Sequence, residues 1–153
     1  MDVFGRMTDL AEGQLTSWVP AISIKHEAQM ILGKTVLWIS ILTFTTYGLV
    51  GFFFPQIPAD FGSLGMLNGD GIAEIAATYG GLQIGIGLFC LLAALNADFY
   101  HSGLALLAIA IGFLGLARFY TFIVIPDPVT GYTYGAIIYE LAIAAAAVIA
   151  LKK

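Results

Sequence analysis

Charged side chains are scarce in this sequence. Lys, Arg, Asp and Glu make up 10% of its 153 residues, whereas 59% of the residues are hydrophobic. Soluble domains carry about 25% charged residues, because their surface has to face water. The composition therefore excludes an ordinary soluble domain and indicates an integral membrane protein.

Basic residues and cysteines are few as well. The six Lys and Arg residues are scattered and the net charge is −4, whereas nucleic-acid binding depends on clustered basic side chains that displace counterions. The single cysteine, Cys90, excludes an intrachain disulfide framework and a cysteine-rich metal site. We therefore expect no nucleic-acid partner and no metal site, and the sequence indicates no particular cofactor.

Long apolar runs are what the sequence has instead. A bilayer core about 30 Å thick needs roughly 20 apolar residues of helix. Four windows reach that length, at about residues 31–54, 71–96, 102–125 and 132–151. Short connections after the second and third windows force antiparallel neighbours. We predict an all-α protein whose transmembrane domain, residues 31–153, is an up-down-up-down four-helix bundle.

Turn signals separate these windows. Pro55 and Pro58 end the first helix, and the Asn-Gly-Asp-Gly turn that follows favours Asp70 as the N-cap of the second. The stretches "NADFYHS" and "PDPVTG" are expected to be the other two connections.

The first thirty residues form a separate N-terminal interfacial segment in this interpretation. Apolar side chains share one face at helical spacing, which predicts an amphipathic helix that ends before Pro20 and lies on the membrane surface: these are Val3, Phe4, Met7, Leu10 and Ala11. The alternative is that this helix docks onto a partner subunit.

Positive charge is distributed unevenly between the two sides of the predicted bundle. Every Lys and Arg residue except Arg118 lies before or at the start of the first window or after the last one. The two connections on the opposite side contain no Lys or Arg, and their charged residues are all acidic. The positive-inside rule therefore predicts a multi-pass protein of the cell inner membrane with both termini in the cytoplasm.

The second, third and fourth apolar windows each contain one charged residue. At a rise of 1.5 Å per residue, Glu74, Arg118 and Glu140 lie roughly 5, 10 and 12 Å below the outer surface. All three therefore belong to the outer half of the bundle. Ionisable groups at that depth usually face the protein interior and mark a pathway or a pocket.

Small residues accompany each of these charges at helical spacing. Thr78, Gly81 and Gly85 follow Glu74, Gly115 precedes Arg118, and three alanines flank Glu140. Such stripes let helices approach closely, so we expect the charges to point into the bundle.

Other polar residues at the same depth complete the predicted site. Tyr47 on the first helix, Tyr79 and Gln83 on the second and Tyr139 on the fourth are expected to form its wall, because deeply placed tyrosines need hydrogen-bond partners. Tyr132 and Tyr134 are more typical of interfacial anchors, and His26 and His101, at the ends of windows, of interfacial residues rather than ligands.

A purely structural explanation of the charges stays open. Glu74 could interact with the positive end of its helix dipole, Arg118 could reach the interface on its long side chain, and Glu140 could pair with Arg118 only to hold two helices together.

The segments "AEIAATYGGLQIGIGL", "GLARFY" and "YEL" resemble a family of four-span bacterial membrane proteins known only as a domain of unknown function. The resemblance covers about residues 35–151. It implies that Glu74, Tyr79, Gly80, Gly81, Arg118 and Glu140 are signature positions, and that Ala76 and Ala77 stand where the family often has a basic residue. It implies no activity.

Two functions of different kinds follow. The first is the binding of a lipid-like or other amphipathic small molecule, with Glu74, Arg118 and Glu140 holding its head. The second is an accessory or structural subunit of a larger membrane complex, or a homo-oligomer. A membrane-embedded acid/base enzyme ranks last, because the metal, serine-nucleophile and phosphate-loop motifs are missing and no catalytic residue stands out. A single chain also lacks a polar path through the inner half, which argues against a channel.

Overall fold

The structure is a computed structural model that describes the backbone of residues 3–152 and the side chains of residues 23–152. Helices account for nearly all of this part of the chain, and it contains no strand. In chain order the elements are α1 (Val3–Phe53), α2 (Gln56–Phe61), α3 (Gly69–Ile75), η1 (Ala76–Gly81), α4 (Leu82–Leu95), α5 (Ala97–Leu106), η2 (Leu107–Ile111), α6 (Gly112–Val124) and α7 (Gly131–Leu151).

Four continuous helical segments are long and apolar enough to cross a membrane. They are Ser23–Phe53, Gly69–Leu95, Ala97–Val124 and Gly131–Leu151. Each overlaps one predicted window, so the all-α class and the four spans are confirmed. The second and third spans each contain a π-helical turn, η1 and η2 respectively.

The first span belongs to a longer helix than expected. α1 runs from Val3 to Phe53 without the break predicted before Pro20; a proline removes one backbone donor and kinks a helix without necessarily ending it. The side chains of residues 1–22 lie outside the described residues. The amphipathic face and its place on the membrane surface therefore stay predictions.

Two helix ends differ from the sequence interpretation. Asn68, not Asp70, caps α3: its backbone is extended and its side chain accepts a hydrogen bond from the Gly71 N–H at 3.1 Å. Asp70 already lies in the first helical turn, so it cannot occupy the cap. The connection predicted over "NADFYHS" shrinks to Asn96, which ends α4 and caps α5 by accepting from the Asp98 N–H at 3.0 Å.

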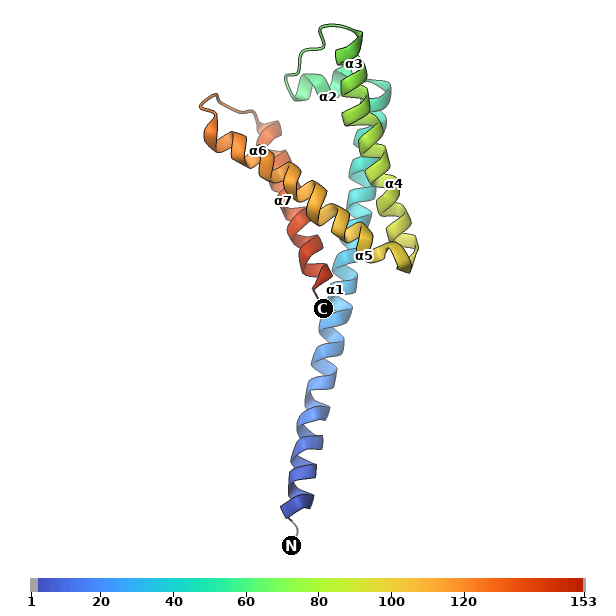
Figure 1. Ribbon diagram of the computed structural model, residues 1–153, viewed down its shortest axis with the longest axis vertical. Helices are drawn as coiled ribbons and strands as arrows, with labels where there is room; N and C mark the ends of the chain where they lie inside the picture. The colour runs from blue at the N-terminus through green and yellow to red at the C-terminus, as the bar shows by residue number, and fades with distance from the viewer. Residues whose placement is uncertain (1–2, 153) are drawn as a thin grey trace.

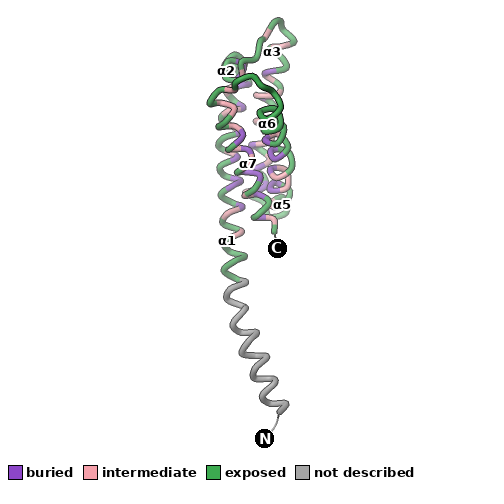
Figure 2. Tube along the Cα trace, turned by 90° about the vertical axis from the view of Figure 1, so that its left-hand side faces the viewer, coloured by how far each residue is buried: buried purple, intermediate pink, exposed green. Residues whose placement is uncertain are grey.

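The helices of the bundle converge at one end and diverge at the other. Figure 1 shows α6 and α7 diverging from α1 and α4 toward the end that carries α2 and the connection at residues 125–130. We call this the loop end, and the opposite end, where α7 stops, the terminal end. The buried positions, purple in Figure 2, lie where the helices face one another, and the largest of the core include Leu37, Leu104, Leu107 and Ile111.

Glycines allow α1 and the second span to pack backbone against backbone. A Cβ atom added at Gly80 would lie 2.6 Å from the Phe52 Cα, and one added at Gly51 would collide with the Tyr79 carbonyl oxygen. The prediction that Gly81 and Gly85 allow this close approach is wrong, because a Cβ atom added at either position would have nothing within 4 Å.

The π-helical turn explains that shift. Ile75 and Gly80 are both buried although they are five residues apart, which is the spacing of a π-helical turn and not of a regular α-helix. A face extrapolated from Glu74 at 3.6 residues per turn therefore misses the face that packs on α1.

Candidate functional site

A cavity of about 360 Å³ lies toward the loop end of the bundle, between α1 and the second span on one side and α6 and α7 on the other. Six of the seven residues predicted to form the site line it, from all four spans: Tyr47, Tyr79, Gln83, Arg118, Tyr139 and Glu140. Its remaining walls are mainly apolar or glycine, with Phe44 and Leu114 among them.

An ion pair forms the polar centre of this cavity. Arg118 Nε donates to Glu140 Oε1 at 3.0 Å, and the two side chains are 24% and 7% exposed. The pair joins α6 to α7, which approach closely because Gly115 lies against Glu140: a Cβ atom added there would be 3.0 Å from the Glu140 Cβ. The predicted meeting of Arg118 with Glu140, and the role of Gly115 beside it, are confirmed.

Tyrosines surround the guanidinium group. The Arg118 Cζ lies 5.9 Å from the centroid of the Tyr132 ring, a distance at which a cation is attracted to the ring face. The Tyr132 and Tyr47 hydroxyl oxygens are 3.3 Å apart, and Tyr47 meets Tyr79 edge to face with centroids 6.5 Å apart. Tyrosines of the first, second and fourth spans thus form a connected group of aromatic rings next to the Arg118 guanidinium.

One buried carboxylate oxygen in the cavity, Glu140 Oε2, has no hydrogen-bond partner among the described residues. The Tyr139 hydroxyl, also buried, lies beside the hydroxyl groups of Thr43 and Ser40. Buried polar groups are nearly always satisfied, and an orphaned carboxylate oxygen is especially costly in a low-dielectric place. This carboxylate oxygen is available to a hydrogen-bond donor that enters the cavity.

Glu74 is the predicted site residue that lies elsewhere. Its side chain is exposed, its described hydrogen bond is the one it accepts from the Thr78 hydroxyl at 3.3 Å, and it does not line the cavity. The cavity therefore contains one guanidinium group and one carboxylate, instead of the one guanidinium group and two carboxylates predicted from the sequence. An excess of negative charge, which would have favoured a cationic ligand, is absent from these lining residues.

A second hollow, of about 270 Å³, adjoins the first on the loop side. Tyr79, Arg118 and Tyr132 line both, and the second is completed by residues 61–64 and 128–130 of the two connections. Arg118 thus lies between a hollow at the loops and one inside the bundle. A polar group could reach it from the loop side, while an apolar group would lie against the inner walls.

Sequence reasoning missed Tyr132 as a member of the site. It was interpreted as an interfacial anchor, although its ring lies under Arg118 and its hydroxyl lies next to that of Tyr47. Its spacing from Glu140, eight residues along one helix, was the available signal, since residues seven or eight apart share a face.

The described residues contain no group of three or more His, Cys, Asp or Glu side chains suited to a metal ion.

Comparison with known proteins identifies the family. The model of a family described as Domain of unknown function (DUF4345) matches residues 32–151. The chain belongs to this family. The matched range contains all four spans except the first part of α1, and it includes every residue of the candidate site. No curated protein and no solved structure matches the chain.

Proposed function

We propose that this DUF4345 protein binds an amphipathic small molecule in the cavity between Arg118 and Gln83. The observation that carries the proposal is the unpartnered Glu140 Oε2 beside the Arg118 pair, in a cavity whose volume of about 360 Å³ lies within the range of small-molecule sites. A molecule that fills this space removes the cost of the orphaned atom.

The chemistry of the lining limits the ligand's head. Glu140 Oε2 accepts hydrogen bonds, the Tyr139 hydroxyl both donates and accepts, and a guanidinium group has further N–H groups besides the one bonded to Glu140. Because the charges of Arg118 and Glu140 balance, a neutral head that both donates and accepts hydrogen bonds fits best. A hydroxylated or carbonyl-bearing lipid, quinone or sterol-like molecule has such a head.

The tail of that molecule would lie between the diverging helices. Phe44 and Leu114 provide apolar surface inside the cavity, and α6 and α7 separate from α1 and α4 toward the loop end. Hydrocarbon chains of the bilayer offer the same environment outside, so a ligand could enter sideways from the membrane.

An orientation in the membrane belongs to the same proposal. The terminal end carries Lys34 and Lys152, whereas residues 54–68 and 125–130 at the loop end contain no Lys or Arg. By the positive-inside rule the terminal end faces the cytoplasm, which places the candidate site in the outer leaflet of an inner membrane.

The test compares two tryptophan substitutions at neighbouring positions of α6. Leu114 lines the cavity, whereas Phe113 is 69% exposed on the outside of the bundle. The purified protein in mild detergent is expected to retain a tightly bound amphipathic molecule by native mass spectrometry. Leu114→Trp should lose it because the indole fills the cavity, and Phe113→Trp should keep it.

Two results would contradict the proposal. One is a purified wild type whose bound small molecules only mirror the bulk lipid. The other is equal retention by both variants. A protein that copurifies in fixed ratio, with no small molecule bound, would favour the accessory-subunit function instead.

A further inference from the structure

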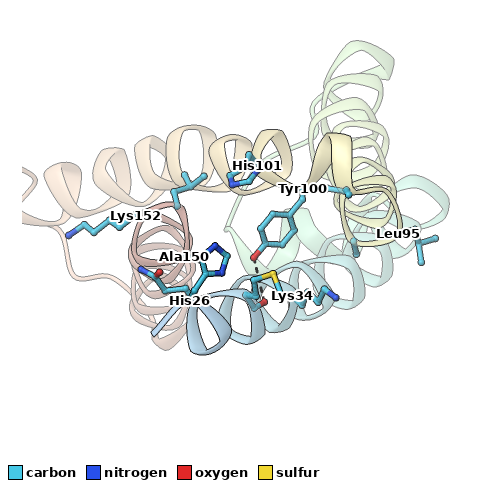
Figure 3. Close-up of a pocket in the computed structure, with 13 residues that line it drawn as sticks. His26, Lys34, Leu95, Tyr100, His101, Ala150 and Lys152 are labelled. Atoms are coloured by element: carbon cyan, nitrogen blue, oxygen red, sulfur yellow. Dashed lines mark hydrogen bonds between the residues drawn. The ribbon is translucent and has the colours of Figure 1, made fainter. Parts of the chain in front are cut away.

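A larger cavity, of about 750 Å³, lies at the terminal end of the bundle among α1, α4, α5 and α7 (Figure 3). Its walls combine small and apolar residues of α4 and α7 with polar side chains from α1, from α5 and from Lys152, the residue after α7. The side chains that can bear a positive charge are His26, Lys34, His101 and Lys152.

The fold places these four side chains, from distant parts of the sequence, around one cavity, with Lys152 and Lys34 at opposite ends of it (Figure 3). Figure 3 shows His26 of α1 and His101 of α5 on different sides of the cavity, with Tyr100 between α5 and α1. Tyr100 lies against α1 because Gly33 leaves room for its ring, and its hydroxyl donates to the Met30 carbonyl at 3.4 Å. Sequence reasoning treated the two histidines as separate interfacial residues.

Among the residues whose side chains the structure describes, none that lines this cavity is acidic. Glu27 and Asp98, the acids nearest to it in sequence, are exposed and are not among its lining residues. Within residues 23–152 the only ion pair is the one between Arg118 and Glu140, so neither Lys34 nor Lys152 has a carboxylate partner there. The described lining therefore has an excess of basic over acidic side chains.

The depth of the cavity matches the headgroup region of a bilayer. Lys34 lies nineteen residues before Phe53, the end of α1, and such a stretch of helix is about 29 Å long. The hydrocarbon core is about 30 Å thick. If Phe53 lies near one face of that core, Lys34 lies at the opposite face, where lipid phosphates are found.

We propose that this cavity binds the phosphate group of an anionic phospholipid. The imidazole N–H groups of His26 and His101 supply donors for the phosphate oxygens, and the Lys34 and Lys152 side chains add positive charge at the two ends of the cavity. Basic recesses between transmembrane helices are suited to such headgroups. Leu95 and Leu151 provide apolar wall for the start of the acyl chains. The site is separate from the Arg118 cavity and does not depend on its ligand.

Binding is tested with the full chain in neutral detergent, followed by native mass spectrometry with added lipid. Phosphatidylglycerol is expected to bind more tightly than phosphatidylcholine, because only the former has a net negative charge. Lys34→Gln and Lys152→Gln should each weaken phosphatidylglycerol binding by about fivefold, the effect of one basic residue near an anionic lipid. Lys34→Arg should retain it.

Lys25→Gln is the matched control, since it removes the same charge from the same helix at an exposed position that does not line the cavity. Equal weakening by Lys25→Gln would show that only general surface charge is involved and would overturn the site. Equal affinity for the two lipids would also overturn it. If inorganic phosphate alone stabilised the protein against thermal unfolding as much as phosphatidylglycerol does, the ligand would be a free anion and not a lipid.

Discussion

Arg118 and Glu140 are the residues on which the candidate site depends. Both charges come from membrane spans, where each alone would be costly, and at 3.0 Å they compensate one another. Breaking a buried pair leaves one uncompensated charge, at a cost of roughly 3 to 5 kcal/mol in proteins. The pair is therefore a stability element as well as the polar centre of the cavity.

Arg118→Ala is expected to lower the thermal stability of the detergent-solubilised protein by on the order of 3 kcal/mol, because it leaves Glu140 buried and unpaired. Combining it with Glu140→Gln should recover part of the loss by removing the orphaned charge. Arg118→Lys should rescue only partly, since an ammonium group does not reproduce the planar guanidinium that donates to Glu140 through Nε and lies over the Tyr132 ring. Scanning fluorimetry measures all of these variants.

Glu74→Ala is the matched control for that series. It removes a carboxylate from a membrane span, but one that is exposed and bonded only to Thr78 among the described residues. We expect a change well below that of Arg118→Ala. A loss of the same size from both variants would contradict the assignment of Glu140, and not Glu74, as the partner of Arg118.

At the scale of the helices, the contact between α1 and the second span depends on a few glycines. Gly80 of η1 lies against the backbone of Phe52, with 2.6 Å between an added Cβ atom and the Phe52 Cα. Backbone atoms cannot move aside as a flexible side chain can. Adding a single methyl group at Gly80 would therefore push the two helices apart.

Gly80→Ala is expected to destabilise the protein by about 1 to 3 kcal/mol, the usual cost of overpacking. Gly85→Ala, five residues on, should be neutral or stabilising by up to about 1 kcal/mol, because nothing lies within 4 Å of the new atom and alanine favours the helix. Thermal unfolding of both variants in detergent checks the difference. A larger loss from Gly85→Ala would show that the packed face is the one extrapolated from the sequence.

The π-helical turn in the second span is the element that connects packing to the site. η1 carries both Gly80, which packs on α1, and Tyr79, which faces the cavity. Without the wider turn, regular helical spacing would put these residues on other faces relative to α3. Rare turns of this kind are often found at functional sites, in keeping with its place here.

At the scale of the whole molecule, the two connections at residues 54–68 and 125–130 lie at the same end of the bundle, since both line the hollow next to Arg118. Four spans in alternating directions require this arrangement. It also means that a ligand from the aqueous phase would meet Arg118 from only one side of the membrane.

Single-cysteine variants in a Cys90→Ala background test that orientation. Gly65→Cys and Asp127→Cys are expected to react with a membrane-impermeant maleimide added to intact spheroplasts, because both positions are exposed at the loop end. Lys152→Cys should react only after the membrane is opened. Reaction of Lys152→Cys from the same face as Gly65→Cys would contradict the three spans that separate the two positions.

The sequence by itself determined the class and topology of this protein. Its shortage of charge, its four apolar windows and its short connections define a four-span bundle, because the thickness of a bilayer sets the length of any helix that crosses it. Regular spacing along α6 and α7 was also enough to predict the pairing of Arg118 with Glu140, since both helices are regular around these residues.

Tertiary structure decided what helical periodicity cannot encode. The π-helical turn η1 rotates the second span, so Gly80 packs on α1 in place of Gly81 and Gly85, and Glu74 stays outside the site. α6 and α7 diverge from α1 and α4 around the cavity in which Arg118 lies over the Tyr132 ring. At the terminal end the helices converge, and His26 and His101 line one cavity there. Both outcomes depend on how helices distant in the sequence pack together, which the local pattern of one chain does not contain.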